Sequence, residues 1–221
     1  MSAARLALLL AVTVTLMTSC TNESTPAAQP ATTLEPTSTT SPITTTTTSI
    51  AEDILVSFPD QASIAPWKYI DDSVMGGVSA STSTWQDGAL VFTGLLSTAN
   101  NGGFSSIFAP VDRTLGARSA GATAFGIDAV GDGRTYVLQL RIGASGDNCW
   151  ISRFTPPVVG DRTLGPIVMP ISSFESVDRF LRPTKASQPL DPATIVQIAV
   201  YVLDGQVGEF RLAMRSISAV R

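Results

Sequence analysis

The chain has 221 residues, of which 44% are hydrophobic and 14% charged, with a formal net charge of -4 at pH 7 and no histidine. This composition is ample for one packed core. It contains no run of Lys or Arg, so we expect no nucleic-acid partner. Without histidine, neither a histidine-based catalytic site nor a zinc centre is expected, and we predict no metal or cofactor.

The first twenty residues read as a secretory signal. Arg5 supplies the positive charge, residues 6–16 form an apolar run too short to span a bilayer, and small residues precede Cys20. Residues 16–20 (LMTSC) resemble the lipobox of bacterial lipoproteins, which implies acylation of Cys20. The alternative is an ordinary signal peptide beside an incidental Cys20. Lipidation predicts a protein of the cell envelope, held by its lipid on the outer face of the cytoplasmic membrane.

Residues 21–50 consist mostly of Thr, Ser, Pro, Ala and Gln. Such a segment buries too little apolar area to offset its ordering entropy, so we predict a disordered stalk. As a coil it spans on the order of 30 Å, and fully extended roughly 100 Å. The folded domain is therefore expected over residues 51–221, held off the membrane by this linker.

Within residues 51–221, short runs alternate apolar and polar residues and end at Gly, Pro, Asn or Asp, which is typical of strands. We predict no long helix, so an antiparallel sandwich or barrel is expected. The ten predicted strands cover residues 54–58, 67–70, 89–96, 104–111, 122–130, 135–142, 149–154, 167–171, 195–203 and 209–217.

Periodicity separates half-buried strands from a central one. Residues 136, 138, 140 and 142 are apolar while the intervening side chains are mixed, as a strand with one buried face requires. Residues 198–203 are apolar on both faces, which predicts a central strand. Between strands, the Asp-Gly pair of residues 130–134 predicts a hairpin. In the polar connection of residues 175–192, Asp191 is expected to cap one helical turn begun by Pro192.

The chain is organised around residues 67–79 (WKYIDDSVMGGVS) and the downstream segment 100–104 (NNGGF). Each contains a Gly-Gly pair, so the backbone is expected to turn sharply or to approach another segment closely there. Asp71 and Asp72 precede the first pair. They either form a carboxylate pair for acid-base chemistry or accept hydrogen bonds from nearby backbone amides, and we favour the second.

An ordered set of segments resembles the complex I intermediate-associated protein 30 family, from about residue 67 to residue 220. This resemblance implies a galactose-binding-type jelly-roll β-sandwich. The best-known mitochondrial member is an assembly factor for respiratory complex I, which suggests a protein partner, but the family offers no catalytic residues to transfer. Residues 156–157, two prolines, depart from the family pattern. The segments that carry it are residues 72–79, 92–94, 101–104, 131–136, 169–174, 190–192 and 204–212.

Two further side chains, Arg134 and Trp85, are candidate contacts for a ligand or partner. Arg134 can form a fork to an anion, or it lies on a hairpin as a surface side chain. Trp85 stands in a polar turn (residues 83–88) and is the best exposed aromatic platform for a sugar, although packing at the core edge is equally open. Trp67 and Trp150 are expected in the core, and Cys149 as a small buried residue.

Three functions follow in order of preference. The first is a non-enzymatic, envelope-anchored module that binds a protein and assists assembly or stability of a complex, with Asp72, Arg134 and Trp85 as candidate contacts. The second is a carbohydrate-binding module for wall or extracellular glycan, using Trp85. The third is a hydrolase using Asp71 or Asp72.

Overall fold

The computed structural model describes residues 52–143, 148–158, 166–186 and 188–221, and all of them belong to one compact unit, Thr47–Arg221. The predicted signal peptide, Cys20 and the stalk lie outside the described residues and stay predictions. In the described ranges, no helix has the length and apolar character needed to cross a membrane.

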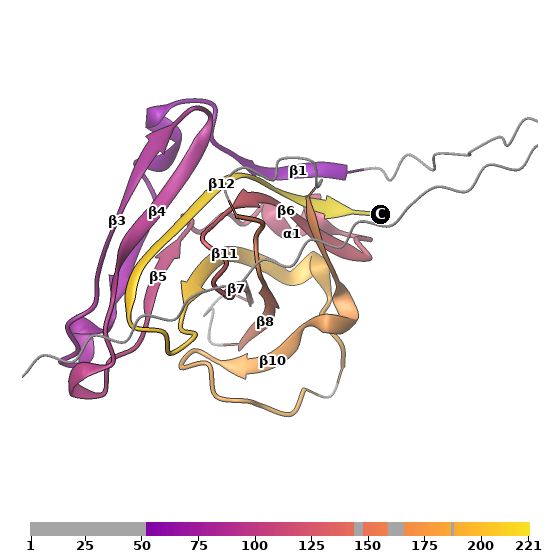
Figure 1. The fold of residues 1–221 in the computed structure, drawn as a ribbon. Coiled ribbons are helices and arrows are strands. Elements are labelled where there is room, and N and C mark those ends of the chain that lie inside the picture. The colour runs from indigo at the N-terminus through magenta and orange to yellow at the C-terminus, as the bar shows by residue number, and fades with distance from the viewer. Residues whose placement is uncertain (1–51, 144–147, 159–165, 187) are drawn as a thin grey trace, which may run out of the picture. The chain divides into compact units, whose positions relative to one another are not determined.

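Two antiparallel sheets of six strands each pack face to face (Figure 1). The predicted jelly-roll β-sandwich is thereby confirmed. Sheet A has the order β3-β4-β12-β6-β9, with β1 paired to the second half of β12. Its strands are β1 (Glu52–Ser57), β3 (Ala80–Gln86), β4 (Ala89–Leu96), β6 (Ala124–Val130), β9 (Ile167–Pro170) and β12 (Gly208–Val220).

Sheet B has the order β10-β8-β7-β11-β5-β2. Its strands are β2 (Lys68–Asp71), β5 (Ser105–Phe108), β7 (Tyr136–Ile142), β8 (Asn148–Phe154), β10 (Glu175–Asp178) and β11 (Ile195–Val202). The connections hold one short helix, α1 (Leu115–Ser119), and the 3-10 turns η1 (Gln61–Ile64), η2 (Asp72–Met75), η3 (Ala99–Asn101), η4 (Ile171–Ser173) and η5 (Pro192–Thr194).

The core lies between the sheets and contains the alternating side chains that the sequence predicts, such as Tyr136, Leu138 and Leu140. Strand β11 lies between β7 and β5, so the prediction of a central strand is confirmed. Its inner side chains join the main core. On the outer face, Tyr201 belongs to a second apolar cluster that Phe104, Phe108 and Leu181 help to cover.

Each of the ten predicted strands overlaps a strand of the structure, and β3 and β10 were missed. Both are sheet edges whose sequences, ASTSTWQ and ESVD, lack an apolar face. Asp191 caps η5 as expected, because its carboxylate accepts a hydrogen bond from the Ala193 amide at 3.0 Å.

The predicted hairpin at residues 130–134 is wrong. Strand β6 belongs to sheet A and β7 to sheet B, so this connection crosses from one sheet to the other. The Asp-Gly pair that does form a hairpin is Asp87-Gly88, between β3 and β4. Both residues have positive φ, 50° and 77°, as the tight turn between right-twisted strands requires. Trp85 therefore lies on an edge strand rather than in a turn.

Candidate functional site

The Asp72 carboxylate is fully buried and is held by four hydrogen bonds. The Ser79 amide and hydroxyl donate to it at 2.8 and 2.6 Å, the Gly103 amide at 2.6 Å and the Phe104 amide at 3.4 Å. Because these donors come from two loops, the carboxylate fastens the loop at residues 73–78 to the loop at residues 97–103. We call this arrangement the Asp72 clasp.

The close approach that the two Gly-Gly pairs predicted occurs at the Asp72 clasp. A Cβ atom on Gly77 would lie 2.3 Å from Asp72 Oδ1, and one on Gly102 would lie 2.4 Å from Asp72 Oδ2. Any side chain at either position would overlap the carboxylate, so both positions need glycine. One glycine of each pair therefore makes room for Asp72.

Burial raises the pKa of Asp72, but the hydrogen bonds from Ser79, Gly103 and Phe104 outweigh it, so this pKa lies below its usual value of 3.8. The ionised carboxylate is thus the stable form. A ligand cannot reach it, and its acceptor capacity is used by the protein. Asp72 was a candidate contact, and the structure places it inside the scaffold.

Two further hydrogen-bonded ties reach β3, the edge strand of the opposite sheet. One comes from β2 and the other from the segment that connects β1 to β2. At one end, Asp71 accepts from the Ser81 amide at 2.9 Å and from the Ser81 hydroxyl at 2.5 Å. At the other end, the Trp85 indole N–H donates to the Phe58 carbonyl at 2.9 Å. The Phe58 ring in turn contacts Trp67, with ring centroids 5.3 Å apart.

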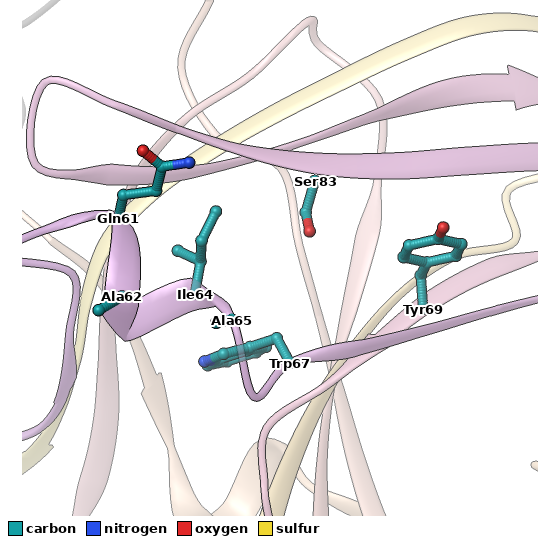
Figure 2. A pocket seen from close by; sticks show the side chains of 7 residues that line it. All are labelled: Gln61, Ala62, Ile64, Ala65, Trp67, Tyr69 and Ser83. Atoms are coloured by element: carbon teal, nitrogen blue, oxygen red, sulfur yellow. The ribbon is translucent and has the colours of Figure 1, made fainter.

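A groove of about 570 Å³ runs between η1, β2 and β3, in the stretch bounded by these ties. Figure 2 shows the Ser83 hydroxyl pointing from β3 towards the space above Ile64 and Trp67, with Gln61 at one end and Tyr69 at the other. We call it the edge groove. Its lining residues are Gln61, Ala62, Ile64, Ala65, Trp67, Tyr69 and Ser83, and none is charged.

The polar groups of the edge groove differ from those of the Asp72 clasp. Within the described part of the chain, the Gln61 amide, the Tyr69 hydroxyl and the Ser83 hydroxyl have no hydrogen-bond partner in the protein. Tyr69 is also 52% exposed. Sequence reasoning missed this site, because it depends on contacts between edge strands of two sheets.

The loop held by the Asp72 clasp carries three exposed apolar side chains. Val74, Met75 and Val78 are 70%, 64% and 53% exposed. Neither this loop, residues 73–78, nor its neighbour at residues 97–103 contains a charged residue. We call residues 73–78 the apolar loop. The apolar loop lies far from the start of β1 (Figure 1). Its neighbour, the loop at residues 97–103, follows the end of β4 that pairs with Gly208 at the start of β12. The start of β1 pairs with Val220, at the other end of β12.

Arg134 is neither on a hairpin nor at the surface, because only 8% of the residue is exposed. Its guanidinium donates to the Gln206 carbonyl at 2.6 Å, to the Glu209 carbonyl at 3.1 Å and to Asp204 at 3.2 Å. The side chain therefore fastens the loop before β12 to the β6–β7 crossover, and we give it no ligand role.

Of the remaining candidates, Trp67, Trp150 and Cys149 are buried, as expected, whereas Trp85 on the edge strand keeps 36% of its surface exposed. No group of three or more His, Cys, Asp or Glu side chains in the described ranges is arranged to hold a metal ion.

Comparisons with known proteins bear on the family and on the fold. Residues 56–214 match the family model of Complex I intermediate-associated protein 30. No curated protein matches the sequence significantly. The family 11 carbohydrate-binding module of a cellulosomal cellulase of Clostridium thermocellum is similar in structure, with a TM-score of 0.54 and 15% identity over 78% of this chain and 96% of that module.

A second structure of such a module from Clostridium thermocellum, in complex with a β-1,3-1,4-mixed-linked tetrasaccharide, gives a TM-score of 0.52 and 16% identity. It covers 76% of this chain and 95% of the module. At these identities the similarity shows a shared fold.

Proposed function

The chain belongs to the Complex I intermediate-associated protein 30 family, and from this premise we propose that it is a non-enzymatic, envelope-anchored module that binds another protein. Assistance to the assembly or stability of a protein complex is the role we favour. The observation that carries the proposal is the apolar loop, with Val74 and Met75 largely exposed on a backbone that Asp72 holds through the Gly77 and Ser79 amides.

A rigid apolar loop favours binding because little conformational entropy is lost when a partner covers it. The absence of charge on both loops at this end fits the centre of a protein interface, where charged residues are depleted and Met is enriched. We therefore expect the partner to present an apolar pocket that receives Val74 and Met75.

The hydrogen bonds of two carboxylates support the non-enzymatic assignment. Asp71 and Asp72, the residues considered for hydrolysis, both accept hydrogen bonds from backbone amides and serine hydroxyls. A carboxylate used in this way is not positioned to exchange a proton with a substrate.

The envelope-anchored part of the proposal rests on the lipobox-like residues 16–20 and requires acylation of Cys20. The test is metabolic labelling with a fatty-acid analogue. We expect label on the wild-type protein and none on Cys20→Ala, whereas equal labelling of both contradicts the anchor.

Protein binding is tested with a photo-crosslinking amino acid placed in the full-length chain in its own cells. We expect one reproducible adduct from position 74 and none from position 111. Val111 is the matched control, since it is 62% exposed and lies between β5 and α1, away from the apolar loop. The same adducts from both positions, or none from position 74, would exclude the apolar loop as the binding surface.

Recognition of a neutral glycan is the second candidate, because the similar modules are carbohydrate-binding and one was solved with a tetrasaccharide. Trp85 was expected to supply the platform. Its indole N–H is bonded to the Phe58 carbonyl. About a third of the residue, 36%, is exposed, so only part of it is available to a ligand. Pull-down of the full-length protein on wall polysaccharide tests this candidate, and failure to bind contradicts it.

A further inference from the structure

We propose that the edge groove binds a short neutral sugar chain. This inference rests on glycan recognition, the second candidate function. It adds the binding site and specifies that the ligand carries no charge. It assigns the contacts to Tyr69, Gln61 and Ser83 in place of Trp85, whose polar group is bonded within the protein.

The groove is held open by the ties at its two ends. From Ser81, bound to Asp71, to Trp85, bound to Phe58, β3 advances four residues, which is roughly 13 Å at 3.3 Å per residue. Between the ties, the small side chains of Ser83 and Ala65 leave space unfilled. Because both walls are fixed before binding, a ligand orders little of the protein.

The hydrogen-bonding groups of the groove fit hydroxyl-rich ligands. A serine or tyrosine hydroxyl donates and accepts, and a glutamine amide does both through separate atoms. Sugar hydroxyls likewise do both, so they match the donor and acceptor capacity of Gln61, Tyr69 and Ser83. Within the described ranges these groups have no partner in the protein, so binding breaks no internal hydrogen bond.

The aromatic wall provides the apolar part of the contact. The ring of Tyr69 is half exposed at one end of the groove, and Trp67 and Ile64 form the floor. An aromatic face with a polar tip suits a ligand that is apolar on one side and wet on the other, as a pyranose ring is.

The charge of the lining selects against ionic ligands. The acidic residues that flank this segment in sequence are hydrogen-bonded within the protein, since Asp60 caps η1 through the Ser63 amide and Asp71 accepts from Ser81. Lys68 directly precedes Tyr69 on β2, so its side chain leaves the strand on the opposite face. An anionic sugar would therefore be desolvated without a partner. A peptide added as a strand to β3 would have to extend past both ties, so we favour the sugar.

The test uses the full-length protein on an array of neutral and anionic oligosaccharides together with extended peptides, followed by titration of the best binder. We expect a neutral oligosaccharide to bind and Tyr69→Ala to weaken its affinity at least about tenfold. Ser83→Leu, which fills the groove, should abolish binding. Phe180→Ala is the matched control, because Phe180 is an exposed aromatic residue (58%) outside the groove, and it should bind as the parent does.

The outcomes separate this proposal from the function on which it rests. If the parent binds a neutral glycan and both Tyr69→Ala and Ser83→Leu still bind it, the edge groove is not the binding site, but glycan recognition stands. If the parent binds no glycan, both the site and glycan recognition are rejected. Selective binding of an anionic glycan or of a peptide also overturns the proposal. Should Ser83→Leu not fold, Tyr69→Ala decides, since its side chain is half exposed.

Discussion

The Asp72 clasp and the edge groove lie at neighbouring positions of one stretch, and they use polar groups in opposite ways. Every oxygen of the buried Asp72 carboxylate accepts hydrogen bonds from the protein, whereas the hydroxyls of Tyr69 and Ser83 accept none from the described residues. A saturated buried group stabilises the fold, and an unsaturated group at the rim of a groove is available to a ligand. Residue type alone does not separate these two cases.

The largest effect is expected at the Asp72 clasp. Gly77→Ala places a Cβ 2.3 Å from Asp72 Oδ1 and should lower the free energy of unfolding by about 3 kcal/mol, because the carboxylate has to leave its donors. Gly76→Ala is the matched control. It has open space but a φ of 93°, so only the left-handed strain of about 1 kcal/mol is expected. Denaturant unfolding measures both variants. Equal losses of unfolding free energy would mean that Gly77 is not needed to leave space for Asp72.

The charge of the clasp gives a pH-dependent prediction. Asp72→Asn keeps the shape but loses charge-assisted hydrogen bonds, so it should lower stability by about 2 kcal/mol at neutral pH. Because the folded pKa of Asp72 is depressed, the stabilisation is complete above the unfolded pKa near 3.8 and is lost as pH falls through that value towards the folded pKa. Urea unfolding at pH 7 and pH 3 should show the gap between parent and variant narrowing. A gap independent of pH would argue that Asp72 is not ionised in the fold.

Much of this scaffold could be predicted from the sequence. Alternation located ten strands, since a buried face leaves a period of two, and the aspartates beside the Gly-Gly pair were expected to bind backbone amides. The exposed edges β3 and β10 bury no continuous face and leave no such period. Two of the Asp-Gly pairs show the same limit: Asp87-Gly88 turns a hairpin and Asp132-Gly133 does not, because the partners of the flanking strands decide it.

The candidate site could not be predicted because its defining property is an absence of partners in three dimensions. Sequence reasoning chose Arg134 and Asp72, whose charged groups form strong hydrogen bonds, and Trp85 for its aromatic ring. Folding brings such groups to acceptors or donors of their own chain, as Arg134 finds the Gln206 carbonyl. The weaker groups of Gln61, Tyr69 and Ser83 converge only once edge strands of different sheets meet.

A smaller effect is expected at the Trp85–Phe58 tie, at the end of the edge groove away from the Asp72 clasp. Trp85→Phe keeps an aromatic ring on β3 but removes the hydrogen bond to the Phe58 carbonyl, so stability should fall by about 1 kcal/mol. The groove then loses one of its two ties, and its hydrogen-exchange protection should drop in β3 more than in β12. If protection is unchanged in β3, the groove does not depend on Trp85 for its shape.

The smallest effect is expected at the polar side chains of the edge groove. Tyr69→Phe removes a hydroxyl that has no hydrogen-bond partner among the described residues. Gln61→Ala removes an exposed amide that likewise has no partner there. Each should change the free energy of unfolding by less than about 0.5 kcal/mol, as substitutions away from internal contacts usually do. Thermal and urea unfolding of both variants beside Asp72→Asn measure this. A loss above about 1 kcal/mol in Tyr69→Phe would show that its hydroxyl already serves the fold, and groups of the groove would then belong with the clasp rather than with a ligand.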